Sequence, residues 1–312
     1  MGTVVLSIDA ELAWGFHDLA DPPRDRIAAA RPAWSCLLAA LDEFSIPATW
    51  AVVGHLLLEE CDGIHADHPR SPEWFARDPG GSADEHEAWF GPDLVRAVHD
   101  SAVDHEIASH GFSHVEFGDP ATTRRTAIAE IEASIEAADR MGLALRSFVF
   151  PRNNVGHRDV LAAYGFRSYR GLGPDRWFDA WPARRAGKLL DAALVRSDPP
   201  LVTPTVDEYG LVNLPASLDL FGFEGAARTL LEPAVGDPVL RQAKAGIDRA
   251  VDGEGVCHLW LHPNNLLAER DVERLRAVLS HLAARREDSS LTVETMGAIS
   301  ERVAPEPGPT PR

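Results

Sequence analysis

The chain has 312 residues and a formal net charge of −18 at pH 7. This length allows a large buried core, in one α/β barrel or in two smaller domains, and the acidic balance argues against nucleic acid or anionic membranes as partners. Three cysteines without regular spacing do not indicate a disulfide framework. No apolar run approaches membrane-spanning length and no signal peptide is visible, so we expect a cytoplasmic protein.

Short strand-like runs alternate with longer helical patterns, which is typical of α/β folds. The predicted strands cover residues 4–8, 48–53, 106–109, 147–150, 166–169, 211–214, 256–261 and 291–293. Residues 122–141 carry an apolar stripe at helical spacing, with Thr122 or Thr123 as a cap and Gly142 as an end. A similar stripe at 272–282 predicts a helix before the last strand. Seven or eight such units favour a barrel of parallel strands.

Two segments interrupt this alternation. Residues 61–91 are rich in Pro, Gly, Asp, His and Trp and are predicted to form a long inserted loop, the kind of loop that often carries function. Residues 171–204 are also irregular and proline-rich, and residues 304–312 are predicted to be a disordered tail. No linker divides the chain, so we expect a single barrel domain over 1–303 with the insertion inside it.

Polar residues follow four of the predicted strands. In barrels of parallel strands, active sites collect at the C-terminal ends of the strands. The residues at these ends are Asp9 and Glu11; His110 and His114; Arg152, Asn153 and Asn154; and His262, Asn264 and Asn265. We therefore expect all four groups to meet at one mouth of the barrel.

Two of these groups predict a metal site. His110 and His114 are four residues apart, so on one helical turn they would face the same way. Zinc in a hydrolase takes about three protein ligands and leaves a position for water. Glu11 can be the third ligand, which spares Asp9 for proton transfer. The alternative interpretation is a pair of surface histidines and an acidic strand end.

Two further segments add acid and oxyanion chemistry. His262 follows the apolar strand 256–261, where an imidazole can serve as a general acid. The turn at 150–153 could aim a backbone N–H at a developing oxyanion. Each has a plain structural alternative, a hydrogen-bonded histidine in the first case and an ordinary proline turn in the second.

A second set of possible ligands lies inside the insertion. Cys61, His65 and His68 have spacings that a metal could use. However, the segment is irregular, and the sequence places no fourth ligand at a suggestive distance. The sequence therefore argues against a structural zinc site in the insertion.

In this order and spacing, the motifs resemble the polysaccharide deacetylases with NodB homology, carbohydrate esterase family four. The resemblance runs from residue 3 to about residue 295. It rests on four motifs: Ser-Ile-Asp-Ala-Glu at 7–11, Ser-His-Gly-Phe-Ser-His at 109–114, Phe-Val-Phe-Pro-Arg at 148–152 and Leu-Trp-Leu-His at 259–262. The resemblance implies an α/β fold, a distorted (β/α) barrel with about seven parallel strands.

The resemblance also implies a role for each motif residue. It makes Asp9 the general base and His262 the general acid, and it makes Glu11, His110 and His114 the ligands of zinc or another divalent metal ion. In the third motif, Arg152 and its neighbour Asn153 are expected to line the site and contribute to substrate or oxyanion binding.

The sequence departs from the usual family pattern at three motifs. Ala10 occupies the place of the second of two adjacent aspartates, so the acidic ligand shifts to Glu11. Val149 stands where the third motif usually has an arginine, and Arg152 is the candidate replacement. The fourth motif, an aspartate near a tryptophan that tunes the acid histidine, has two candidate pairs: Asp175 with Trp177, and Asp179 with Trp181.

The implied activity is that of a metal-dependent hydrolase that removes N-acetyl groups from an amino sugar or a sugar-containing glycan or intermediate. Two alternatives stay open. One is a same-fold amidohydrolase acting on a small non-sugar cyclic amide, which the missing export signal favours because cell-wall glycans lie outside the cell. The other is a non-catalytic glycan-binding relative. The expected partner is thus a carbohydrate or a small amide.

Overall fold

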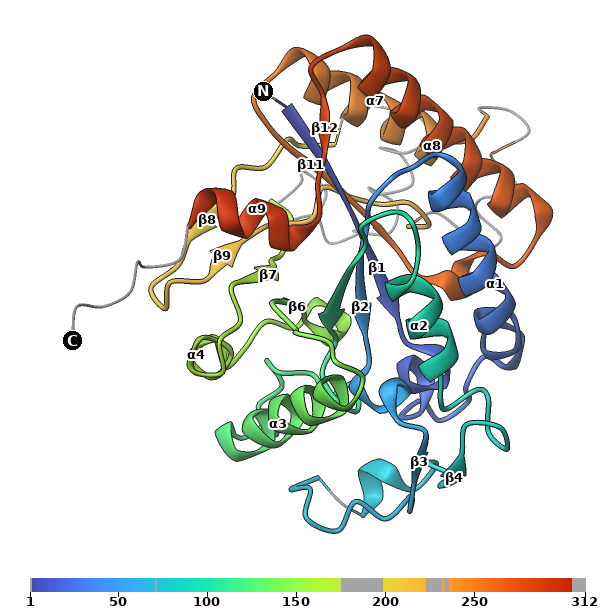
Figure 1. Cartoon of the computed structure of the whole chain (residues 1–312), viewed down its shortest axis with the longest axis vertical. Coiled ribbons are helices and arrows are strands. Elements are labelled where there is room, and N and C mark those ends of the chain that lie inside the picture. The colour runs from blue at the N-terminus through green and yellow to red at the C-terminus, as the bar shows by residue number, and fades with distance from the viewer. Residues whose placement is uncertain (1, 71, 175–198, 223–231, 233–235, 305–312) are drawn as a thin grey trace, which may run out of the picture.

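The computed structural model describes residues 2–70, 72–174, 199–222, 232 and 236–304. Its central feature is a curled, mostly parallel sheet that forms a half-barrel with helices packed around it (Figure 1). The predicted distorted (β/α) barrel is therefore confirmed. Within the described ranges, no helix combines the length and the apolar character needed to cross a membrane.

Ten strands form the sheet, in the order β10–β11–β1–β2–β5–β6–β7–β9–β8, with β12 also paired to β1. The pairings are parallel except for β8 with β9. All eight predicted strands are present, with ends shifted by no more than two residues. The strands are β1 (Gly2–Ala10), β2 (Thr49–Val52), β5 (Glu106–Ser109), β6 (Ser147–Val149), β7 (Ser168–Arg170), β8 (Thr205–Val206), β9 (Val212–Asn213), β10 (Leu218–Asp219), β11 (Gly255–Leu261) and β12 (Thr292–Val293).

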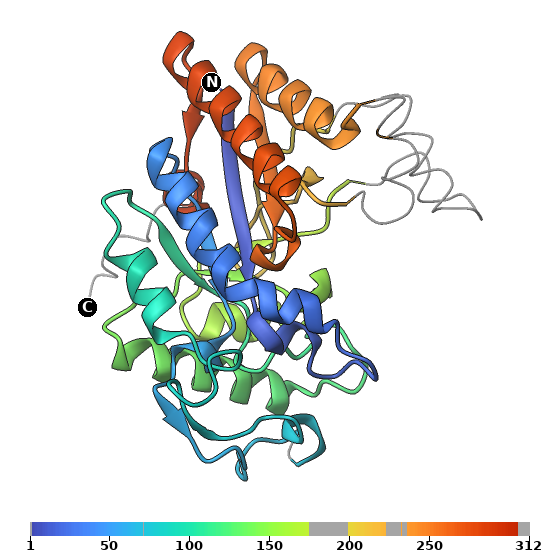
Figure 2. The same cartoon turned by 90° about the vertical axis from the view of Figure 1, so that its right-hand side faces the viewer.

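Helices cover the outside of the sheet. Figure 2 shows α1, α7 and α8 side by side over the region of β1 and β11. The described helices are α1 (Arg24–Glu43), α2 (Pro92–His99), α3 (Arg124–Arg140), α4 (Arg158–Ala163), α7 (Pro238–Asp252), α8 (Glu269–Asp288) and α9 (Met296–Val303).

The ends of α3 follow from local sequence. Thr123 is the N-cap, and its hydroxyl accepts a hydrogen bond from the backbone N–H of Thr126 at 3.2 Å. The chain leaves the helix through Gly142 at a φ of +73°, a left-handed conformation that glycine adopts without strain. Both predicted boundaries of the helix are confirmed. Of the two candidate N-caps, Thr123 is the one that caps the helix.

Strand β1 is buried on both faces and separates the core from the site. Val4, Leu6 and Ile8 belong to the largest hydrophobic cluster, which includes residues of α1, α7 and α8. Because side chains alternate along a strand, Ser7 and Asp9 point to the opposite face. Both are almost fully buried. The hydrophobic side of β1 thus anchors the strand, and the other side carries polar groups into the half-barrel.

The inserted segment contains short elements of its own. Its two strands, β3 (Glu60–Cys61) and β4 (Gly81–Ser82), pair antiparallel outside the main sheet, and the 3₁₀ turn η3 (Glu73–Phe75) lies between them. Just before it, the 3₁₀ turn η2 (Gly54–Leu57) follows β2. Figure 1 shows this segment beyond the end of the sheet, next to the loops that follow β1 and β2. The predicted loop is thus a folded extension on the side of the sheet where strands end.

Candidate active site

Strand register brings the polar strand ends together. Asp9 lies level with Ala51 of β2, which is level with Ala108 of β5. On the other side of β1, Ile8 is level with Leu261, so His262 emerges beside Asp9. Since these strands are parallel, the residues that follow them share one edge of the sheet.

Three side chains form a compact group at this edge. The Nε2 atoms of His110 and His114 lie 3.2 and 3.1 Å from Oε1 of Glu11. All three side chains are at most 6% exposed. Nδ1 of His110 lies 2.8 Å from the Val149 carbonyl, which only accepts, so Nδ1 is the donor of that hydrogen bond and Nε2 is the atom that faces Glu11. A carboxylate oxygen and two imidazole nitrogens gathered in a buried site fit a shared cation.

The loop that carries the two histidines is not the helical turn that their spacing suggested. Gly111 and His114 have φ values of +74° and +63°, so the chain reverses between the imidazoles. The carboxylate of Glu130 in α3 holds this loop from behind, accepting hydrogen bonds from the backbone N–H groups of Phe112 at 2.8 Å and Ser113 at 2.9 Å. The histidines converge because of this buried carboxylate rather than because of helical periodicity.

The position of Glu11 depends on a glycine. The residue precedes the 3₁₀ turn η1 (Leu12–Phe16), and its side chain lies against Gly15 of that turn. A Cβ at position 15 would lie 2.0 Å from Oε2 of Glu11. Only glycine leaves room for the carboxylate there.

Asp9 pairs with an arginine that the sequence did not single out. Both oxygens of Asp9 accept hydrogen bonds from the guanidinium of Arg170 in β7, at 2.6 Å each. The same guanidinium donates to Ser7 at 3.0 Å and to Asn153 at 3.0 Å, and it stacks 4.5 Å from the ring centroid of Trp260. Burial would raise the pKa of Asp9, but Arg170 and the neighbouring imidazoles outweigh it and lower that pKa, which keeps the carboxylate charged.

Arg170 is a second arginine to set beside the candidate of the third motif. Arg152, the candidate replacement for the family arginine, pairs with Asp18 at 2.5 Å and Glu116 at 2.9 Å at the rim of the site. Arg170 ends β7, the strand predicted at 166–169. The rule that site residues follow strands therefore covered position 170, but only the fold showed that β7 curls round to face β1.

His262 lies on the other side of the cluster. Its Nε2 is 3.4 Å from Oε1 of Glu11 and 3.8 Å from Oδ2 of Asp9, and its side chain is 25% exposed. Burial alone would lower the pKa of His262, but the carboxylates of Glu11, Asp9 and Asp219 raise it to about 9. The imidazole therefore holds a proton at neutral pH beside an open space.

That open space is a cavity of about 310 Å³. Asp9, Glu11, His114 and His262 all reach it, so the polar cluster opens to solvent at one place. The cavity is also lined by Arg152, Asn153, Asp219 and Trp260. The structure thus brings together Asp9, Glu11, His110, His114 and His262, with Arg152 and Asn153 at the cavity wall.

Asp219 is a wall residue that the sequence did not identify. Asp219 ends β10 and lies level with Trp260 of β11 in the register. Its charge helps to raise the pKa of His262, which is the part that the fourth-motif aspartate was expected to play. The expected residues for that motif, Asp175 with Trp177 or Asp179 with Trp181, lie outside the described residues.

The family model described as polysaccharide deacetylase matches residues 24–168, a stretch that includes His110 and His114. No curated protein matches the chain. Among solved structures, the fold is similar to a Mycobacterium smegmatis protein described as a polysaccharide deacetylase (TM-score 0.62, 19% identity, 99% of this chain and 94% of that one).

Two further structures have similar folds. One is a Pseudomonas aeruginosa PAO1 protein also described as a polysaccharide deacetylase (TM-score 0.60, 13% identity, 98% and 92% coverage). The other is PuuE allantoinase (TM-score 0.59, 14% identity, 98% and 92% coverage). At these identities the likeness concerns the fold. Together with the family model, it confirms the resemblance of this chain to the polysaccharide deacetylase family.

Proposed function

We propose that the protein is a metal-dependent amide hydrolase that removes acetyl groups from an N-acetylated amino sugar. The observation that carries the proposal is the gathering of both histidines around Glu11, with the Nε2 atoms of His110 and His114 at 3.2 and 3.1 Å from its Oε1. Asp9 and His262 lie on either side of this group. Two imidazoles and one carboxylate suit zinc or a similar divalent ion and leave a position free for water or substrate.

The three ligands would hold the cation with Oε1 of Glu11 and the Nε2 atoms of both histidines. When bound, a divalent ion polarises an amide carbonyl and lowers the pKa of a water molecule. Glu11 and His114 line the 310 Å³ cavity, so an acetamide group entering from solvent would meet the ligand group there.

Asp9 is suited to take a proton from the attacking water. Its bidentate pairing with Arg170 keeps it ionised and fixes its orientation, and it lines the cavity. A positioned general base contributes about 10²–10⁴-fold to the rate of such a reaction.

His262 is suited to protonate the leaving amine. Its raised pKa keeps it in the acid form, and its partial exposure at the cavity lets it reach a substrate nitrogen. An amine leaves slowly unless it is protonated as the C–N bond breaks. The base and the acid therefore flank the ligand group in the arrangement that amide hydrolysis needs.

In the turn after β6, one of the backbone N–H groups already has an acceptor. The backbone N–H of Asn153 donates to the Phe150 carbonyl at 2.9 Å, so it is already used. The side-chain oxygen of Asn153 accepts from Arg170. Asn153 acts through Arg170 on the orientation of Asp9, and Arg152 lies at the rim where substrate enters.

A smaller amide is the second candidate substrate. The cavity lies at the low end of the 300–1,000 Å³ typical of ligand pockets, so it suits one sugar ring or a compact cyclic amide. The fold is also similar to that of PuuE allantoinase. A cyclic ureide is therefore the second substrate to test, because its hydrolysis would use the same residues on a ring that is not a sugar.

The experiment compares two substrate classes on metal-analysed protein. We expect acetate release from N-acetylglucosamine and its short oligomers, increased by added zinc or cobalt. Ring opening of allantoin without acetate release from any acetylated sugar would favour the small-amide alternative. Binding of glycans with no hydrolysis of either class in metal-supplemented buffer would overturn the enzymatic proposal.

A further inference from the structure

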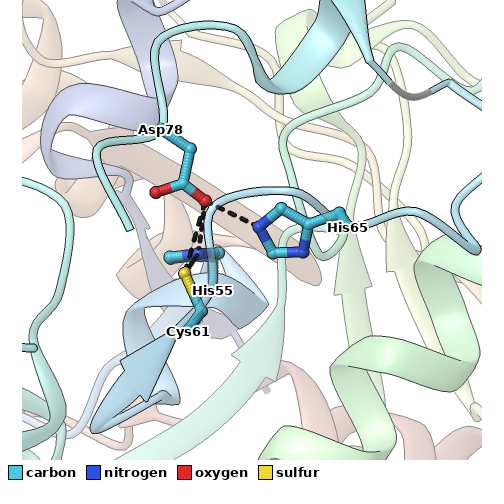
Figure 3. Close-up of side chains that lie close together, drawn as sticks. All are labelled: His55, Cys61, His65 and Asp78. Carbon is cyan, nitrogen blue, oxygen red and sulfur yellow. Dashed lines mark hydrogen bonds and ion pairs between the residues drawn. The ribbon is translucent and has the colours of Figure 1, made fainter. Parts of the chain in front are cut away.

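A second group of possible metal ligands lies away from the candidate active site. It consists of His55 in η2, Cys61 in β3, His65 in the following loop and Asp78 just before β4, and we call it the insert cluster. Figure 3 shows the four side chains pointing toward one another. One ligand atom from each lies within 4.8 Å of those of the other three. This corrects the sequence interpretation, which found no fourth ligand for Cys61 and His65.

The fourth ligand was missed because the expected third one was wrong. His68 lies 3.1 Å from Glu130 instead, behind the loop that carries His110 and His114. The actual partners are His55, which precedes the insertion, and Asp78, thirteen residues after His65. The chain brings them together through the antiparallel pairing of β3 with β4.

The distances in the insert cluster resemble the edges of a coordination tetrahedron. From the Nε2 of His55, the Sγ of Cys61 is 3.3 Å away and the Oδ2 of Asp78 is 3.0 Å away. Asp78 Oδ2 also lies 3.5 Å from Cys61 Sγ and 2.6 Å from His65 Nε2. Ligands around tetrahedral zinc are about 3.3 Å apart for N and O pairs and about 3.6 Å when one is S. The three other distances are within about 0.3 Å of these edges, whereas the distance between His65 and Asp78 would have to lengthen by about 0.7 Å.

The orientation of His55 presents one ring nitrogen to the cluster. Its Nδ1 lies 3.3 Å from the carbonyl of Trp89, which can only accept, so Nδ1 is the donor of that hydrogen bond. Nε2 is then the ring atom that faces Oδ2 of Asp78 at 3.0 Å and Sγ of Cys61 at 3.3 Å. An ion placed between these three atoms would be held by all of them.

The burial and charge of the cluster also favour a bound cation. The side chains of His55 and Asp78 are fully buried, and that of His65 is 11% exposed. A buried carboxylate is costly unless a cation or several hydrogen bonds compensate it. Among the described residues, the ion-pair partners of Asp78 are the imidazoles of His55 and His65, and none is a lysine or an arginine.

A reactive thiol is the competing interpretation. The carboxylate of Asp78 lies 3.5 Å from Sγ of Cys61, so the thiol has a negative neighbour. An activated cysteine nucleophile needs a positive environment instead. A bound cation would supply positive charge and would itself deprotonate the thiol.

We propose that His55, Cys61, His65 and Asp78 bind a structural zinc ion that fastens the insertion to the half-barrel. Four protein ligands leave no position for water, which is the pattern of structural rather than catalytic zinc sites. A thiolate with two imidazoles selects zinc over magnesium or calcium. Binding releases the proton of Cys61 to solvent, so the charge of the site is balanced by two anionic ligands.

The site would act on the active-site loop through backbone contacts. The N–H groups of Gly54 and His55 donate to the carbonyls of Gly111 at 2.7 Å and Phe112 at 2.9 Å. These residues lie between His110 and His114. The ring of His55 also packs 4.5 Å from that of Trp14, in the turn that follows Glu11. An ion in the insert cluster thus braces both segments that carry the ligands of the candidate active site.

An ion can also reach the insert cluster. A surface cavity of about 720 Å³ is lined in part by Cys61, His65 and Phe112. This opening lies between the insertion and α3, whereas the active-site cavity is lined by other residues. The two sites can therefore be loaded and emptied separately.

The test uses the full-length chain, stripped of metal with a chelator and reloaded with Co²⁺. We expect two equivalents of cobalt per chain and a near-ultraviolet thiolate-to-cobalt absorption band. In Cys61→Ser the band is lost and about one equivalent remains. In the double variant Glu11→Gln/His110→Ala one equivalent also remains, but the band is retained.

Cys36→Ser is the matched control, because Cys36 lies on α1 away from any ligand group and its loss should leave both equivalents and the band unchanged. Wild-type protein that binds cobalt without the thiolate band overturns the proposal, as does a band that survives Cys61→Ser. If Cys61→Ser fails to fold, the thiolate band in the wild-type spectrum and its retention in the double variant still test whether the insert cluster binds the ion. Loss of hydrolysis alone bears on the active site and not on this proposal.

Discussion

The two candidate ligand groups of this protein share two imidazoles and a carboxylate, yet their surroundings differ. Around Glu11, His110 and His114, the next polar side chains are Asp9 and His262, and a cavity opens beside them. In the insert cluster, the fourth position is taken by Cys61 and the side chains are packed against aromatic rings. An open position with an acid and a base nearby suits catalysis, whereas a closed set of four suits structure. The surroundings of a ligand group, more than its ligands, distinguish these two roles.

The strongest test of this contrast is Asp9→Asn. We expect acetate release to fall about 10²–10⁴-fold, because the amide cannot take the proton of the attacking water. Metal content should be unchanged, since Asp9 is not one of the three ligands. The variant also leaves Arg170 without a charged partner, so circular dichroism at low temperature is needed to confirm folding. Near wild-type activity in the folded variant would show that Asp9 is not the base.

Two arginines offer the next largest effect, now on stability. Arg170→Gln should lower the free energy of unfolding by about 3–5 kcal/mol, because it leaves the buried carboxylate of Asp9 uncompensated. Arg152→Ala should cost about 0–1 kcal/mol, since its ion pairs are partly exposed. Urea unfolding of both variants measures the difference. Equal losses would contradict the assignment of Arg170, rather than Arg152, as the partner of Asp9.

Gly15→Ala should weaken metal binding at the group of Glu11, His110 and His114 while leaving the insert cluster unchanged. The expected effect is smaller than the two above. The added methyl group would overlap Oε2 of Glu11 and displace that ligand. We expect affinity for the first metal to fall about 10–100-fold, as when the support of a ligand is disturbed, with the insert cluster unaffected. Competition with a chelator of known affinity measures each site. Equal weakening of both sites would mean that the glycine supports the fold generally.

The smallest effect concerns a buried carboxylate without imidazoles beside it. Glu106 begins β5, at the opposite end of the sheet, and accepts hydrogen bonds from Thr49 Oγ1 and the Gly297 N–H, each at 2.8 Å. Burial raises its pKa above the ordinary value of 4.5. Its contribution to stability is therefore full at low pH and declines as pH rises through the raised pKa.

Glu106→Gln removes this decline. Melting temperatures of wild type and variant across the acid-to-neutral range should diverge in favour of the variant as pH rises above 4.5. A constant difference, or one that reverses sign, would contradict the raised pKa.

The first ligand group could be predicted from the sequence, whereas the insert cluster could not. Asp9, His110 and His262 each lie at the C-terminal end of a strand whose apolar pattern is clear, and parallel register then fixes their common edge. The arginine on β7 needed the curvature of the sheet, which the pattern of single strands does not contain. His55 and Asp78 meet through an irregular segment, where no periodicity relates sequence distance to distance in space.

The same reasoning explains where the motif pattern misled. Spacing of four residues suggested a helical turn for His110 and His114, but Gly111 and the buried Glu130 impose a loop. The two histidines still converge, by a different local structure. Residue types at strand ends were therefore a better guide than the local conformation inferred from their spacing.

Anomalous X-ray scattering at the zinc edge, from crystals of the full chain grown with zinc, tests the central claim most directly. The account predicts one peak among Glu11, His110 and His114, with Asp9 and His262 beside it but not bound, and a second peak within the insert cluster. Absence of density among Glu11, His110 and His114 would contradict the account, because the proposed chemistry depends on those three side chains sharing one ion.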